Sequence, residues 1–377
     1  MVSAIPVVEP LAGCPSHRVV VASRTLQAIA QAYGFDGDTE ELTDVFHTLT
    51  ASWRETPASS PPPWSGLGAD ASGCDVSIVL GGPHREIRVT AEAQGHPASP
   101  QSYWDAATRL SETLRARYGA DLSRLYAVRD VFRSFAADAA GALWHGAVFR
   151  RDRAPWYKVY LHLMSQGRPQ ARETTCAALE RLGLSDVWPE VERRLQPGDE
   201  LLFLSFDLVA ASQSRIKLYV RHGEATPASL ESACRIDGVD HSGGVREFVA
   251  GLLDGDERAI RRGALTSFHL KTGSDAPVHS ATHIRLYPHC GQSDADLAGR
   301  LKRTLRRFDI ATGPYEAVIA ALARGALDRE QGIHGWASIQ WTDDRPIVTV
   351  YLSPRLYLGR YGAIGLDPDR MWPTPLA

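Results

Sequence analysis

Polar and apolar side chains alternate strictly along residues 214–220, which read SRIKLYV. Arg215, Lys217 and Tyr219 stand two residues apart, and isoleucine, leucine and valine fill the alternate positions. Successive side chains of a β-strand point to opposite faces of the sheet. The pattern therefore predicts a strand with two cations and a phenol on one face and apolar side chains on the other.

Versions of this pattern recur along the chain. In each copy, the position two residues before the tyrosine position is residue 88, 158, 217, 285 or 349, so the intervals are 70, 59, 68 and 64 residues. Such spacing indicates a loose repeat of about 65 residues, present five times. The other copies are WYKVYLHLM (156–164), THIRLYPHC (282–290), PIVTVYLSP (346–354) and REIRVTAEA (85–93).

Each copy follows another apolar stretch and, before that, sequence with helical periodicity. In 122–135, for example, Leu125, Val128, Phe132 and Phe135 recur three and four residues apart, the spacing of one buried helix face. A short polar or Gly/Pro-bearing segment joins the two apolar stretches, as in a hairpin. The unit is therefore helix, helix, strand, strand. Its first strands are predicted at 74–80, 141–149, 200–209, 263–271 and 332–341.

We predict a single domain over residues 1–377. In the first unit, the proline-rich segment 55–68 separates a helix at about 39–54 from its strands. A tail over 356–377 follows the last unit. The five units span roughly 37–95, 100–165, 170–222, 226–289 and 292–355.

Five such units contain ten strands joined by hairpins. Closing them into a barrel removes the exposed edges of an antiparallel sheet. Helices need apolar strand faces to pack on, so the apolar face points outward and the polar face inward. The predicted fold is α+β: a ten-stranded antiparallel β-barrel ringed by outer α-helices. Ten strands enclose more space than eight, which side chains can just fill, so a polar chamber is expected.

Composition narrows the kinds of partner. The formal net charge is −3 and the sequence pI is about 6.5, which argues against a protein that coats nucleic acid or an anionic membrane. No apolar run approaches about 20 residues, so we expect no membrane span. Five scattered cysteines and the absence of a signal-like N-terminus favour reduced thiols in the cytoplasm. We expect small-molecule substrates and a monomer or homodimer.

The inward face carries the chemistry of a diphosphate site. Arginine contacts phosphate bidentately and lysine supplies a point charge. Tyrosine hydroxyls can donate to phosphate oxygens, and tyrosine ring faces stabilise a nearby carbocation. An allylic diphosphate binds as an anion, and the departure of its diphosphate leaves an allyl cation. The sequence has no DDxxD motif to bind the diphosphate through magnesium. The cations are Arg88, Lys158, Arg215, Lys217 and Arg285, and the tyrosines are Tyr160, Tyr219, Tyr287 and Tyr351.

The segments RIKLY (215–219), YKVY (157–160), IRLYP (284–288) and VYLSP (350–354), in this five-unit layout, resemble the aromatic prenyltransferases of the dimethylallyl-tryptophan synthase type. These have the ABBA (α-β-β-α) barrel, also called the PT barrel, and the length suggests the bacterial branch. The resemblance implies an enzyme of secondary metabolism, a prenyltransferase that needs no metal or other cofactor. It would transfer a dimethylallyl group from dimethylallyl diphosphate to the indole ring of L-tryptophan or a tryptophan-derived indole.

The family also has a carboxylate on its first strand that accepts a hydrogen bond from the indole N–H. Asp75 stands at the matching position, where family members commonly have glutamate. With Lys158 and Lys217 it forms the predicted catalytic set. Trp144 and Trp336 lie on first strands and are candidates for the acceptor pocket. The base that takes the ring proton is left open among His145, His162 and Glu92.

Two alternatives stay open at this point. The same barrel could prenylate a hydroxyaromatic acceptor, although a phenol calls for a base more than for an N–H acceptor such as Asp75. A barrel that only binds an anionic ligand is the second alternative. Phosphate binding alone does not require four tyrosine rings, which weighs against that reading.

Overall fold

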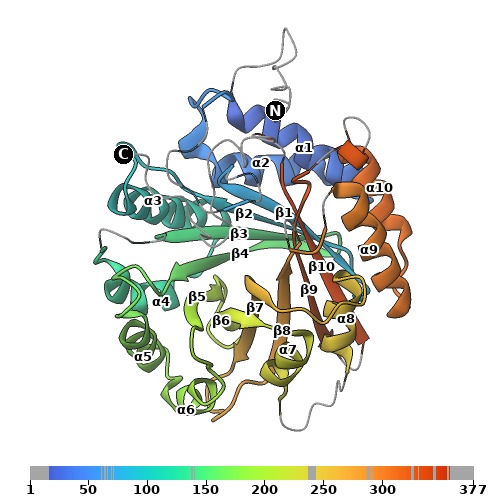
Figure 1. The fold of residues 1–377 in the computed structure, drawn as a ribbon. Coiled ribbons are helices and arrows are strands. Elements are labelled where there is room, and N and C mark those ends of the chain that lie inside the picture. Colours follow the sequence, from blue (N-terminus) through green and yellow to red (C-terminus); the bar gives the residue numbers. More distant parts are fainter. Residues whose placement is uncertain are drawn as a thin grey trace, which may run out of the picture.

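The computed structural model describes residues 17–60, 62, 65, 67–68, 70, 72–136, 139, 141–236, 243–286, 289–291, 293–323, 327–329, 331–342, 345–354 and 356. In this part of the chain ten antiparallel strands form a closed barrel, in which each strand pairs with its sequence neighbours and β1 pairs with β10 (Figure 1). The strands are β1 (Cys74–Leu80), β2 (Glu86–Glu92), β3 (Leu143–Arg150), β4 (Arg153–His162), β5 (Glu200–Asp207), β6 (Ile216–Ala225), β7 (Ile260–Leu270), β8 (His279–Arg285), β9 (His334–Thr342) and β10 (Arg345–Leu352).

Two helices precede each strand pair, and they follow one another around the outside of the barrel in chain order (Figure 1). The predicted fold of five helix-helix-strand-strand units around a ten-stranded barrel is confirmed. Within the described ranges, no helix is both long and apolar enough to cross a membrane. The helices are α1 (Arg18–Ala32), α2 (Thr39–Leu49), α3 (Pro100–Tyr118), α4 (Ser123–Val128), α5 (Ala171–Arg181), α6 (Trp188–Glu192), α7 (Pro227–Cys234), α8 (Gly244–Leu252), α9 (Asp294–Arg307) and α10 (Gly313–Leu322).

The hydrophobic core lies between the barrel's outer face and the helices. On β4, Val159 and Leu161 are fully buried in this layer, and on β6 Ile216 and Leu218 are too. Period two then directs Lys158 and the other polar members of these strands inward. Part of the inner face keeps accessible surface, although the barrel is closed, so it encloses space. The partly accessible inner residues include Asp75, Arg88, Thr90, Tyr160, Lys217, Arg285, Trp336, Gln340 and Tyr351.

The first unit begins earlier than the sequence pattern indicated. The helix α1 precedes α2 and packs against α10, which completes the ring of helices. Its opening residues RVVVAS contain a β-branched run, which is more typical of a strand. Burial of Ala22, Leu26 and Ile29 on one helix face outweighs that local preference. The residues before 17 lie outside the described part.

Outside the barrel, Asp294 at the start of α9 binds the beginning of β9. Its carboxylate accepts hydrogen bonds from the backbone N–H groups of Ile333 and His334, at 3.0 and 3.2 Å. The His334 ring nitrogen Nδ1 lies 2.7 Å from the same carboxylate. Both side chains are fully buried. Asp294 therefore anchors a helix of the outer ring to the barrel.

Replacing Asp294 by alanine should lower the free energy of unfolding by about 3–5 kcal/mol, because buried donors and a histidine lose their partner. Urea denaturation of the two proteins measures the difference. A loss below about 1 kcal/mol would show that water replaces the carboxylate there.

Candidate active site

Four cationic side chains share one region inside the barrel. Arg88 comes from β2, Lys158 from β4 and Lys217 from β6, and Arg215 lies immediately before β6. Burial lowers the pKa of Lys217 well below its usual value, and the charges on Lys158, Arg215 and Arg88 lower it further. Such coupling requires proximity, so these four predicted cations converge.

Two carboxylates hold three of these cations. Glu86 accepts hydrogen bonds from Nη2 and Nε of Arg88, at 2.7 and 3.1 Å. Asp207 bridges two others: its Oδ1 lies 3.2 Å from Lys158 Nζ, and its Oδ2 accepts from Arg215 Nε at 2.7 Å. Burial alone would raise the pKa of both carboxyls, but the facing cations hold both below the usual range.

Lys217 has a different environment from Lys158. Its Nζ lies 3.5 Å from Gln340 Oε1, and among the described residues no carboxylate oxygen comes within 4 Å of it. Burial also lowers the pKa of Lys158, to about 8, but Asp207 opposes that shift. In this region the described residues place four cationic side chains beside two carboxylates, Glu86 and Asp207, so it is suited to attract an anion.

A row of aromatic rings continues around the inner face from β4 to β10. The ring centroids of Tyr160 and Tyr219 are 6.1 Å apart, those of Tyr219 and His283 are 5.6 Å apart, and those of His283 and Tyr351 are 6.2 Å apart. Burial raises the pKa of the three tyrosines. Burial and nearby cations lower the pKa of His283 to about 3. All four rings are therefore uncharged at neutral pH, with π-faces available to a cation.

The sequence also predicts that Arg285 and Tyr287 contact the prenyl donor. Arg285 is on the inner face of β8, opposite Trp336 of β9 in the strand register. Trp336 is also opposite Tyr351 of β10, so it lies next to the aromatic row. Tyr287 lies outside the described residues.

Asp75 lies on the inner face of β1, directly opposite Thr90 of β2. Its Oδ1 is buried and has no hydrogen-bond partner among the described residues. Burial raises the pKa of Asp75 to about 7, and a hydrogen bond with Thr90 moderates the rise. A buried, unpartnered carboxylate oxygen costs about 1–3 kcal/mol, so it suits an N–H group supplied by a ligand.

Glu92, a second buried carboxyl at this end of the barrel, already binds an indole of the protein itself. The Trp144 indole N–H donates to Glu92 Oε1 at 2.8 Å, and burial raises the pKa of Glu92 to about 7. The Trp144 ring contacts Phe203 and His162, with centroids 4.9 and 4.8 Å away. Glu92 thus binds Trp144 through Oε1, whereas its Oε2, like Asp75 Oδ1, has no hydrogen-bond partner among the described residues.

A protein-family model described as tryptophan dimethylallyltransferase matches residues 45–316, more than two thirds of the chain. The chain belongs to the tryptophan dimethylallyltransferase family. The family assignment made from the inward cation and tyrosine pattern is therefore confirmed, and so is the classification as a prenyltransferase.

Solved structures of relatives share this barrel. The 6-dimethylallyltryptophan synthase from Micromonospora olivasterospora, solved in complex with DMASPP and Trp, is 28% identical, with a TM-score of 0.83 over 91% of this chain and 99% of its own. The prenyltransferase PriB, in a ternary complex with L-tryptophan and dimethylallyl thiolodiphosphate, is 25% identical, with a TM-score of 0.81 over 91% and 98%. The 5-dimethylallyltryptophan synthase from Streptomyces coelicolor, at 22% identity and a TM-score of 0.82 over 91% and 99%, has the same fold.

One of the three candidate bases, His145, does not face the chamber. His145 faces outward from β3, where its Nε2 lies 2.8 Å from Ser111 Oγ of α3. Burial lowers its pKa to about 3. The strand alternation that directs Trp144 inward directs His145 into the helix-facing layer, so His145 is not a base for the chamber.

The sequence pattern missed three side chains of the chamber. Glu86 and Asp207 lie at inward positions of β2 and β5, and His283 lies at an inward position of β8. For the diphosphate site, only the cations and tyrosines of the repeated strand pattern were selected from the sequence. Extending the period of two along each strand, to Phe203, Ser205 and Asp207 for example, would have included them.

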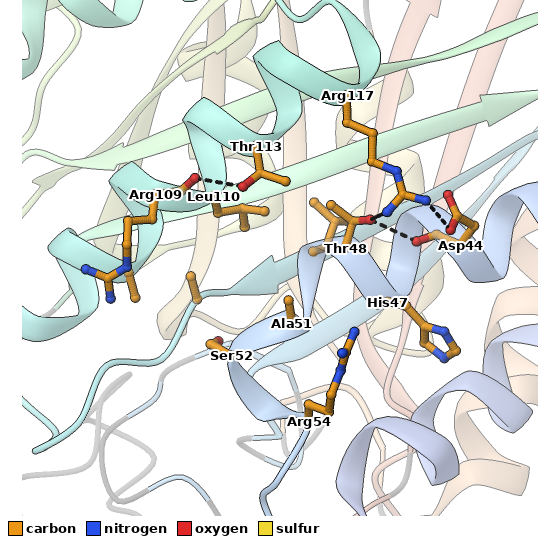
Figure 2. Close-up of a pocket in the computed structure, with 13 residues that line it drawn as sticks. Asp44, His47, Thr48, Ala51, Ser52, Arg54, Arg109, Leu110, Thr113 and Arg117 are labelled. Atoms are coloured by element: carbon orange, nitrogen blue, oxygen red, sulfur yellow. Dashed lines mark hydrogen bonds and ion pairs between the residues drawn. The ribbon is translucent and has the colours of Figure 1, made fainter.

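A separate cleft of about 500 Å³ lies outside the barrel between α2 and α3 (Figure 2). Arg117 reaches across it to Asp44 Oδ1 at 2.6 Å and to Thr48 Oγ1 at 3.0 Å. His47, Arg54 and Arg109 line it as well, together with apolar residues such as Leu110. None of the residues predicted for the chemistry lies there, so the candidate active site is the inner chamber.

Proposed function

We propose that this protein transfers a dimethylallyl group from dimethylallyl diphosphate to the indole ring of L-tryptophan, or of a tryptophan-derived indole, without a metal ion. Family membership supports the reaction class. The choice of an indole as acceptor rests on Asp75, a buried carboxylate on the inner face of the barrel whose Oδ1 has no hydrogen-bond partner among the described residues. Relatives solved with Trp and an allylic thiolodiphosphate support the same pair of substrates.

The donor would bind with its diphosphate among Arg88, Lys158, Arg215 and Lys217. Their charges stabilise the negative charge that develops on the leaving diphosphate as its C–O bond breaks. This is the task that magnesium performs in enzymes with an acidic diphosphate motif, and four protein cations can perform it instead. Arg285, one strand further on, is proposed as a further diphosphate contact.

The allyl cation would form beside the aromatic row. Tyr160, Tyr219 and Tyr351 are uncharged and close together, and each ring face is worth about 0.5–2 kcal/mol toward a nearby cation. The rings also keep water away from the cation, which would otherwise be hydrolysed. Tyr287 is proposed for the same shield from its place in the sequence pattern.

Asp75 would accept the hydrogen bond of the acceptor's indole N–H. This contact fixes the indole and increases the electron density of its ring, which then attacks the allyl cation. Loss of the proton from the substituted ring carbon restores aromaticity. Trp144 and Trp336 are proposed to border the acceptor pocket.

The experiment supplies dimethylallyl diphosphate with either L-tryptophan or a hydroxynaphthalene and detects products by mass spectrometry. We expect tryptophan, and not the hydroxynaphthalene, to gain one C5H8 unit. Turnover of the hydroxynaphthalene alone would instead support the hydroxyaromatic alternative. No product with either acceptor, despite binding of the diphosphate, would support a barrel that only binds anions.

A further inference from the structure

Asp207 occupies a central place among the cations of the chamber. It lies at the end of β5, directly opposite Lys158 of β4 in the strand register, and its backbone N–H donates to the Arg215 carbonyl at 3.2 Å. Its side chain is only 4% exposed. One carboxylate oxygen is paired with Lys158 and the other with Arg215, so the residue joins strands β4, β5 and β6.

Holding these side chains in place has a physical advantage. Free lysine and arginine side chains each lose about 2 kcal/mol of rotamer entropy when they become ordered. A shared, buried carboxylate orders both before the donor arrives, and a preorganised charge stabilises a leaving group better than a mobile one.

The two lysines of the chamber provide an internal comparison. Lys158 has Asp207 beside it, and its pKa falls only to about 8. Lys217 is buried in the same region without an adjacent carboxylate among the described residues, and burial and the neighbouring cations lower its pKa well below the usual value. The carboxylate of Asp207 thus accounts for a charged Lys158 near neutral pH. The other titratable or charged groups that face this region are Glu86, Arg88, Arg215, Lys217, His269 and His279.

We propose that Asp207 is a positioning residue, which holds Lys158 charged and directs both Lys158 and Arg215 toward the diphosphate of the donor. It acts through these two cations and does not touch the dimethylallyl group that is transferred. The inference rests on the proposed function for its substrate. It adds a role for a residue outside the cation and tyrosine pattern.

The test compares the wild type with Asp207→Asn and Asp207→Glu. In the Asn variant we expect KM for dimethylallyl diphosphate to rise about tenfold or more, while KM for tryptophan stays within about twofold. The alkaline limb of kcat/KM for the donor should move about one pH unit lower, because Lys158 loses its proton more readily. Asp207→Glu keeps the charge and should restore the wild-type pH profile in large part.

Asp294→Asn is the matched control, since it makes the same chemical change at a buried aspartate outside the barrel. We expect it to lower the melting temperature without changing the donor KM or the pH profile. If Asp207→Asn behaved like this control, or bound the donor more tightly than the wild type, the positioning role would be wrong.

Calorimetric titration with inorganic pyrophosphate separates this proposal from the proposed function. Wild-type protein should bind pyrophosphate, and Asp207→Asn should bind it about tenfold more weakly. This result would support the role of Asp207 even if tryptophan were not the acceptor. Equal affinity in the two proteins would overturn the role of Asp207, even if tryptophan were prenylated normally.

Discussion

Replacing Lys217 by alanine should reduce kcat/KM for dimethylallyl diphosphate by about tenfold or more. A charge-assisted hydrogen bond in a buried site contributes about 1.5–3 kcal/mol, and the leaving diphosphate would lose one such contact. Lys217 is also the chamber lysine without an adjacent carboxylate among the described residues, so its Nζ is available to an anionic ligand. Steady-state kinetics with varied donor and saturating tryptophan measure the loss.

Lys271 supplies the control for this variant. It is an exposed lysine just after β7, and Lys271→Ala should leave kcat/KM within about twofold of the wild type. If Lys217→Ala were equally harmless, Lys217 would not contact the diphosphate. A rise in KM for tryptophan only would place Lys217 at the acceptor instead.

The Asp75→Asn variant should prenylate tryptophan about tenfold more slowly or worse, because a neutral amide replaces a charged acceptor for the indole N–H. In the wild type the pKa of Asp75 is raised to about 7, so kcat/KM for tryptophan should fall as the pH drops below about 7. The Asn variant cannot titrate at this position and should lack that acidic limb. Initial rates across the pH range test both expectations.

Ionisation of Asp75 with rising pH should increase activity but decrease the stability of the folded protein. Burial raises the pKa of Asp75 above its value in the unfolded chain, so its stabilising contribution is complete at low pH and is lost as the pH rises through about 7. At about pH 8, Asp75→Asn should therefore melt at the same temperature as the wild type or higher. A variant with normal rates and an unchanged acidic limb would remove Asp75 from the mechanism.

The barrel could be predicted from the sequence because its two signals agree. A period of two places apolar side chains outside and cations inside, and a repeat of about 65 residues shows that five units do so. The first strand of the first unit, predicted at 74–80, is Cys74–Leu80 in the structure. Helix α1 was not predicted, because the β-branched residues at its start locally favour a strand and only tertiary packing makes them helical.

The candidate site was less predictable than the fold. A repeating pattern identifies what the units share, such as Lys158 and Lys217, but counter-charges need not repeat. Asp207 bonds to cations from two neighbouring strands, and only the register between strands reveals that. The hydrogen bond from Trp144 to Glu92, and the lack of a partner for Asp75 Oδ1 among the described residues, also depend on distances that no sequence pattern contains.

The central claim is that protein cations hold the diphosphate while an indole attacks. Its most direct test measures the turnover of dimethylallyl diphosphate and L-tryptophan by metal-stripped protein in the presence of EDTA. The product is identified by NMR. We expect prenylated tryptophan to form at the same rate with EDTA as with added magnesium. Loss of turnover in EDTA that magnesium restores would contradict the proposed function of the cations.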